Sequence, residues 1–242
     1  MIQSAINAIK AYFDALAIIK KLNLWKYFFI PVIISAITAI VIGTFSYFLS
    51  DDLGYYLAKL WPWEFGKETF TAIGNVLSGI AIFALGLMLY KHIVLALASP
   101  FMSPVSLKIE EHLYGKQHQH KPSTFSESLA RGIRISVRNI GKELLLTIPI
   151  LLLSFIPVIG LFSSILLFLI QAYYAGFGNM DYTLERHYNY KDTVAFVQKN
   201  RGTAIGNGIV FILFLLIPFV GVLLVLPFSV TAATTQTLRK IR

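Results

Sequence analysis

The chain has 242 residues, of which 56% are hydrophobic and 14% are charged, and it contains no cysteine. A soluble domain of this length needs more charge to cover its surface, so the composition favours a membrane protein. The lack of cysteine excludes disulfides, thiolate metal sites and a cysteine nucleophile. The net charge of +9 indicates basic ends and loops beside anionic lipid rather than a nucleic-acid partner. No linker divides the chain, so we expect a single domain over 1–242.

The first 22 residues show the pattern of an amphipathic helix. Their apolar side chains recur every three or four positions, at Ile2, Ile6, Ile9, Phe13, Leu16 and Ile19. This spacing places them on one face of a helix. We therefore expect a helix over 1–22 that lies in the membrane interface.

Two uncharged stretches are long enough to cross a bilayer. The first, 27–49, has Pro31 in its first turns and rises about 35 Å as a helix, which exceeds the thickness of the hydrocarbon core. The second begins at residue 69, and we expect its helix to end at residue 98. Lys91 and His92, near the end of this second span, are the one ionisable pair within the long apolar runs. An intramembrane enzyme is therefore disfavoured.

A basic segment follows at 124–142. Thr124 and Glu127 have the spacing of a capping box, which predicts a helix start. Four cations then recur on one stripe at Arg131, Arg134, Arg138 and Lys142. One interpretation is a surface helix whose cations touch lipid phosphates. The other is an electropositive vestibule that concentrates an anion before it enters a pore.

Two later uncharged runs, 144–180 and 203–238, are each interrupted by Pro-x-x-Gly, at 157–160 and at 218–221. Each arm has about 15 to 18 residues, which is short of the roughly 20 that a full crossing needs. Each run is therefore either two short spans or a helical hairpin that enters the membrane and returns. We favour the hairpins, because the backbone groups freed at the break need burial against protein.

The distribution of Lys and Arg predicts the orientation. These residues are frequent in 1–26, in 99–143, in 181–201 and at the C-terminal end, whereas 50–68 is poor in them. The positive-inside rule places 50–68 outside and both termini in the cytoplasm. Full crossings at both hairpins would give the same sides, so the charges do not determine how deep the hairpins reach.

Other polar residues do not indicate catalysis or metal binding. Three histidines lie in a hydrophilic segment, at His112, His118 and His120. No further ligand stands at a defined spacing from them, so we expect a solvated loop and no metal. An ion cluster at a helix end is favoured over a proton relay for the residues after the first hairpin, Asp181, Glu185 and Arg186.

Several segments are similar to one family in their residues, order and separation. They are Phe-Ile-Pro at 29–31, Ala-Ser-Pro-Phe at 98–101, Glu-Glu-His-Leu-Tyr-Gly at 110–115, Phe-Ile-Pro-Val-Ile-Gly at 155–160, Met-Asp-Tyr at 180–182, and Ile-Pro at 217–218 through Pro227 to Thr-Ala-Ala-Thr at 231–234. Over nearly its whole length the chain resembles the CysZ sulfate-permease family and the related etoposide-induced membrane proteins. The resemblance implies an all-α integral membrane protein with two long transmembrane helices and two hemi-penetrating hairpins. It also implies an oligomeric, ATP-independent sulfate permease of the bacterial inner membrane that supports sulfur uptake.

The resemblance further implies an anion site just before the first span. The family carries its sulfate site there on a Gly-Leu/Ile-Arg-Arg stretch, and the matching positions here are Asn23, Leu24, Trp25 and Lys26. Tryptophan and lysine replace the two arginines, so bidentate guanidinium contacts are absent. Arg131, Arg134 and Arg138 are the candidate vestibule.

Two functions from different classes fit these observations. The first is a permease or channel for an inorganic anion, with sulfate as the default ion and no cofactor. The second is a non-transporting membrane protein that organises lipids or partner proteins. The altered anion motif supports the second, whereas the basic stripe and the resemblance support the first.

Overall fold

The computed structural model describes residues 2–58, 67–115, 123–153, 157–217 and 220–242. Within these ranges the chain forms eight helices and no strand, which confirms the expected all-α fold. The helices are α1 (Ile2–Lys21), α2 (Trp25–Ala58), α3 (Lys67–Tyr114), α4 (Phe125–Leu153), α5 (Pro157–Leu184), α6 (Tyr190–Lys199), α7 (Arg201–Leu215) and α8 (Val220–Ile241). By length and composition, three stretches of the described residues are able to cross a membrane: Ile2–Lys21, Trp25–Leu49 and Leu85–Tyr114. The molecule is an all-α membrane protein.

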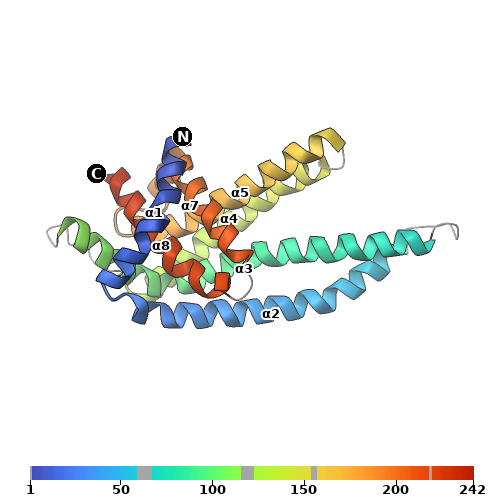
Figure 1. The fold of residues 1–242 in the computed structure, drawn as a ribbon, viewed down its shortest axis with the longest axis horizontal. Coiled ribbons are helices and arrows are strands. Elements are labelled where there is room, and N and C mark those ends of the chain that lie inside the picture. The colour runs from blue at the N-terminus through green and yellow to red at the C-terminus, as the bar shows by residue number, and fades with distance from the viewer. Residues whose placement is uncertain (1, 59–66, 116–122, 154–156, 218–219) are drawn as a thin grey trace.

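Helices α2 and α3 form a long antiparallel pair that extends away from the other helices (Figure 1). The second expected span, 69–98, lies inside a longer helix, because α3 continues through Pro100 and Pro104 to Tyr114. A proline inside a helix removes a backbone hydrogen bond, which usually ends or kinks the helix. Here the last turns of α3 are buried in the core through Met102, Val105 and Ile109, and this packing offsets the loss.

Helix α1 packs on α7 and α8 through a face of small residues. Ala8, Ala11 and Ala15 on this face are buried. Tyr12 and Ile19 are also buried there, whereas most other bulky apolar side chains point away, with Ile2 76% exposed and Phe13 82% exposed. The apolar face expected from the sequence is thus largely free to contact lipid, and the placement of 1–22 in the membrane interface remains a prediction.

The basic segment 124–142 is not a separate helix. It is the first part of α4, which continues without a break into the first arm of the 144–180 hairpin and ends at Leu153. The expected capping box is present, because the Glu127 N–H donates to the Thr124 hydroxyl at 3.3 Å and the Thr124 N–H donates to the Glu127 carboxylate at 2.7 Å. Nothing between residues 142 and 144 favours a turn, so the helix continues.

The second hairpin is formed by α7 and α8. Helix α7 has 15 residues, which corresponds to about 22 Å and is less than the hydrocarbon core. Along the long axis of the molecule, the described ends of the α4–α5 and α7–α8 pairs stop short of the far end of the α2–α3 pair (Figure 1). Residues 154–156 and 218–219, which belong to the expected tips, lie outside the described residues.

Helices α5 and α7 approach each other unusually closely. Small residues four apart face each other in antiparallel register, Ala172 and Gly176 on α5 against Gly208 and Ala204 on α7. A Cβ added at Gly208 would overlap the Ala172 carbonyl, and one added at Gly176 would overlap the Ala204 carbonyl. This is the small-residue packing by which membrane helices bring their backbones together.

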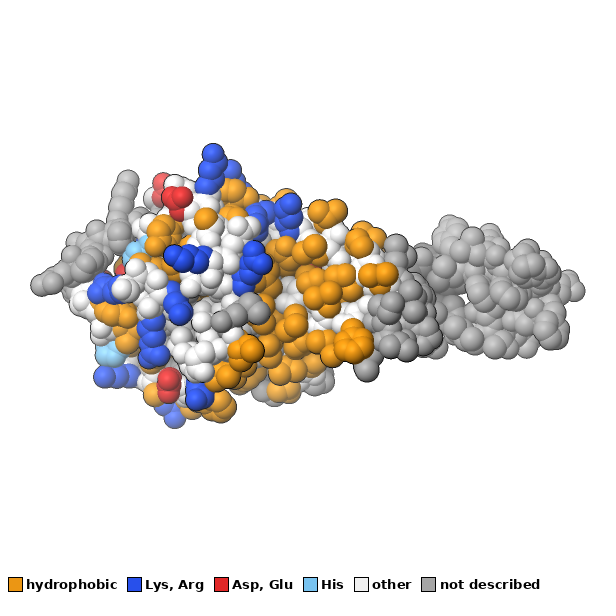
Figure 2. Space-filling model, turned by 90° about the horizontal axis from the view of Figure 1, so that it is seen from above, with side chains coloured by type: hydrophobic (Ala, Val, Ile, Leu, Met, Phe, Trp, Pro, Cys, Tyr) orange, Lys and Arg blue, Asp and Glu red, His pale blue; other side chains and the backbone are white. Residues whose placement is uncertain are grey.

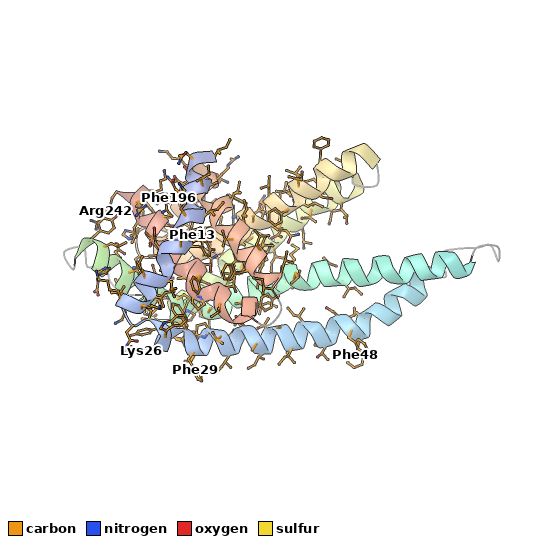
Figure 3. The ribbon with its side chains drawn as sticks, viewed as in Figure 1. Phe13, Lys26, Phe29, Phe48, Phe196 and Arg242 are labelled. Carbon is orange, nitrogen blue, oxygen red and sulfur yellow. The ribbon has the colours of Figure 1, made fainter. Side chains whose placement is uncertain are left out.

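The surface has two zones along the long axis. Lys and Arg side chains gather at the end that holds both termini, and a band of hydrophobic side chains follows next to it (Figures 1 and 2). Along α2, Phe29 and Phe48 are 69% and 66% exposed and project away from α3 (Figure 3). An apolar band beside a basic end is typical of a membrane protein whose apolar band lies in the bilayer and whose basic end lies at the membrane surface.

Candidate functional site

The turn between α1 and α2 has an unusual backbone. Asn23 has a φ of +49°, the one positive φ at a non-glycine residue among those described. Asparagine tolerates this left-handed conformation better than most residues, which explains how it stands where the related family has glycine. The Asn23 N–H donates to Lys20 O at 3.2 Å and the Leu24 N–H donates to Ile19 O at 3.0 Å, which closes α1. Leu24 is fully buried and anchors the turn in the core.

The start of α2 leaves two backbone donors available. The Tyr27 N–H donates to Leu24 O at 2.9 Å, whereas the amides of Trp25 and Lys26 donate to no backbone carbonyl within the described part of the chain. Unpaired amides at a helix start, together with the positive end of the helix dipole, favour an anion. Both residues are exposed.

A second lysine, from α3, joins this turn. The Lys26 and Lys108 ammonium nitrogens lie 5.4 Å and 5.1 Å from the centroid of the Tyr27 ring. The sequence interpretation missed Lys108, because the helix was expected to end at residue 98. Once α3 continues to Tyr114 beside antiparallel α2, its last turns lie next to the first turns of α2. The turn therefore carries two lysines and two free amides.

The arginines of the candidate vestibule have different surroundings. Arg131 is bound on all sides: its Nε and Nη2 donate to the Asp181 carboxylate at 3.1 Å and 2.8 Å, its Nη1 donates to Tyr188 O at 2.9 Å, and its Nη2 also donates to the Thr193 hydroxyl at 2.6 Å. This bidentate pair joins α4 to the end of α5 and to α6. Arg131 is therefore a structural contact in this molecule rather than a cation free to attract an anion.

Arg134 and Arg138 stack on aromatic rings. The Arg134 guanidinium lies 4.1 Å from the centroid of Tyr190, and that of Arg138 lies 5.1 Å from the centroid of Phe177. Arg138 also donates to the Asn139 side chain at 2.8 Å. Such stacking positions a guanidinium and leaves its outer N–H groups for other acceptors.

The pair in the second span has a buried partner that the sequence did not reveal. The Lys91 ammonium lies 2.5 Å from Glu143 Oε1, and the His92 Nε2 lies 2.8 Å from Glu143 Oε2. Lys91 also donates to Gln171 O at 3.3 Å. All three ionisable side chains are at most 2% exposed. The carboxylate of α4 thus allows two basic groups of α3 to be buried.

A second set of buried ion pairs lies after the first hairpin, where an ion cluster of Asp181, Glu185 and Arg186 was expected, but these pairs are made with residues of other segments. Arg186 pairs with Glu110 at 3.2 Å, and His187 lies 3.0 Å from the same carboxylate. Burial lowers the pKa of the Arg186 guanidinium, and Glu110 opposes that change. Burial raises the pKa of the Glu185 carboxyl, which accepts a bond from the Ser128 hydroxyl at 3.1 Å. The cluster ties the end of α3 to the segment between α5 and α6.

The three histidines of the hydrophilic segment were expected to form a solvated loop. Among the residues that the structure describes, no group of three His, Cys, Asp or Glu side chains is arranged to hold a metal ion. His118 and His120 lie outside those residues.

The described helices, three of which contain stretches able to cross a membrane, and the basic end define an all-α membrane protein. Residues 11–226 match the family described as Sulfate transporter CysZ/Etoposide-induced protein 2.4, and the chain belongs to that family. A comparison with curated proteins finds no match.

Proposed function

We propose that this chain is a permease or channel for an inorganic anion, with sulfate as the first candidate, in the inner membrane of a bacterium. Membership of the family supports transport in general. The observation that carries the proposal is the turn at Asn23, Leu24, Trp25 and Lys26, which has two unpaired backbone amides and is followed by Tyr27, whose ring has the ammonium groups of Lys26 and Lys108 beside it. A doubly charged oxyanion satisfies such donors.

The same turn predicts weak selection among oxyanions. An arginine contacts an oxyanion with two parallel N–H groups, whereas a lysine acts as a point charge on a flexible stem. With tryptophan and lysine in place of the family's two arginines, and with Lys108 as the second cation, geometry contributes little to recognition and charge contributes most. In the proposed vestibule, Arg131 is paired with the Asp181 carboxylate. Arg134 and Arg138 are therefore the members that are able to attract the anion towards the membrane.

For the topology, we propose hemi-penetrating hairpins and cytoplasmic termini. The 15-residue length of α7 supports a hairpin that does not cross. The basic end that carries both termini supports their cytoplasmic position (Figures 1 and 2). The exposed bulky face of α1 supports a homo-oligomer, because it offers an apolar surface to a second copy as well as to lipid.

A non-transporting protein that organises lipids or partner proteins is the second candidate. The observation in its favour is that Trp25 and Lys26 stand where the family's anion motif has two arginines. Uptake of labelled sulfate into liposomes that contain the purified protein separates the two candidates, because the second predicts no flux above that of empty liposomes.

Removing both lysines of the turn is expected to reduce sulfate uptake. In the Lys26→Ala, Lys108→Ala double variant, the uptake rate at low sulfate should fall by about tenfold or more, since a charge-assisted contact is worth roughly 1.5–3 kcal/mol. The matched control is Lys191→Ala, Lys199→Ala, which removes two exposed lysines of α6, the helix that carries Phe196 in Figure 3. Equal losses in the two double variants would show that net charge matters rather than this turn.

A further inference from the structure

A cavity of about 470 Å³ lies where α4, α5 and α7 meet, away from the α1–α2 turn. Three cations line it, Arg138 and Lys142 from α4 and Arg201 from α7. Arg138 and Lys142 are four residues apart and therefore share one face of α4. None of the described residues that line the cavity is acidic. Glu143, the neighbour of Lys142, points instead to the buried Lys91 and His92.

The remaining lining is ordered from polar to apolar in the same direction on all three helices. Tyr173 and Tyr174 of α5 and Gln198 from the end of α6 accompany the cations, and the apolar wall consists of Leu146, Leu166, Leu169, Ile170 and Ile205. On each helix the apolar residues lie one or two turns from the polar ones towards the tip of the hairpin. The cavity thus has a basic, aromatic mouth and an apolar wall nearer the tip of the hairpin, part of which is exposed at the surface.

The mouth also lies at the level where the chain enters the membrane. Lys142 and Glu143 are the last charged residues of α4 before the uncharged run 144–180, and Arg201 is the last before the run 203–238. Tyrosines are enriched at the level of the lipid headgroups, and basic side chains there attract lipid phosphates. The three helices therefore bring their boundary residues together around one cavity.

We propose that this cavity binds one anionic phospholipid, whose phosphate contacts Arg138, Lys142 and Arg201 and whose acyl chain lies along the apolar wall. A free oxyanion shares the chemistry of the lipid phosphate, but it makes no favourable contact with the five aliphatic side chains of the apolar wall. Basic pockets between membrane helices on the cytoplasmic side are suited to acidic headgroups. The proposal is independent of whether the protein transports sulfate.

The test is lipid binding to the purified full-length protein in detergent, measured by native mass spectrometry with phosphatidylglycerol. One retained phosphatidylglycerol per chain is expected, and phosphatidylcholine should bind far more weakly. The Arg138→Gln, Lys142→Gln, Arg201→Gln variant should lose roughly a hundredfold in affinity, since each basic residue near an anionic headgroup contributes about fivefold. A matched triple variant of exposed lysines elsewhere, Lys10→Gln, Lys20→Gln, Lys191→Gln, should bind like the native chain.

A single substitution provides a second test in case the triple variant does not fold. Lys142→Glu alters one exposed side chain and should weaken phosphatidylglycerol binding at least about tenfold, because it replaces attraction by repulsion. Unchanged phosphatidylglycerol binding in Lys142→Glu and in the triple variant would overturn the proposal. So would equal retention of phosphatidylcholine, or displacement of the lipid by millimolar inorganic sulfate, which would show a site for a free oxyanion.

Discussion

Replacing Glu143 by alanine is expected to lower the free energy of unfolding by about 3–5 kcal/mol. Its carboxylate lies 2.5 Å from the Lys91 ammonium and 2.8 Å from the His92 ring, and all three groups are buried. Without it, two basic groups of α3 remain in an interior that offers Lys91 one carbonyl, Gln171 O at 3.3 Å. The cost comes from the unpaired partners rather than from the lost attraction alone.

The measurement is a denaturant titration of the purified protein in mild detergent. Glu143→Gln keeps the shape of the side chain and one acceptor oxygen, so it should lower the free energy of unfolding by less than the alanine variant does. Glu111→Ala is the matched control, since Glu111 is also a glutamate of the charged end and takes part in none of the described ion pairs. If Glu143→Ala lowered the free energy of unfolding by less than about 1 kcal/mol, the Glu143 carboxylate would have to be hydrated or paired with other groups, and the prediction would be wrong.

Replacing Gly208 by alanine is expected to destabilise the protein by about 3 kcal/mol or more, through one added methyl group. The new Cβ would overlap the Ala172 carbonyl of α5, and backbone cannot move aside as the end of a flexible side chain can. Helices α5 and α7 must then separate, which also loosens the reciprocal contact between Gly176 and Ala204.

Gly141→Ala is the control for this prediction. A Cβ at Gly141 of α4 meets nothing within 4 Å, so alanine there should be neutral or stabilise by up to about 1 kcal/mol through helix propensity. Both variants are compared with the native chain by thermal unfolding in detergent. The close α5–α7 contact is refuted if the two substitutions shift the unfolding temperature equally.

Local features of the sequence predicted the helices well. The apolar spacing of 1–22, the uncharged stretch 27–49 and the capping box at Thr124 and Glu127 correspond to α1, α2 and the start of α4. These signals are local, because periodicity, length and caps depend on residues within a few turns of each other. The charged residues at the end of α5 were visible locally, but the ion partner of Arg186 was not, because Glu110 is 76 positions away along the chain.

Features that depend on distant packing were not predictable in the same way. Helix α3 continues through Pro100 because residues that follow it are buried by other helices. Arg131 pairs with Asp181, fifty positions away along the chain, so a stripe of cations in the sequence does not show which of them is free. Lys108 reaches Tyr27 through the antiparallel α2–α3 pair, and no short-range pattern marks it.

The proposed transport function requires that an oxyanion binds at the α1–α2 turn. Sulfate titration by calorimetry on the purified protein tests it through a gain of function, with the Trp25→Arg, Lys26→Arg variant beside the native chain and Lys26→Ala. Guanidinium groups at these positions would add bidentate contacts to the free amides, so the arginine variant should bind sulfate at least about tenfold more tightly, and Lys26→Ala should lose the weak binding of the native chain. Sulfate binding that is the same in all three proteins, or absent from all three, would contradict the claim.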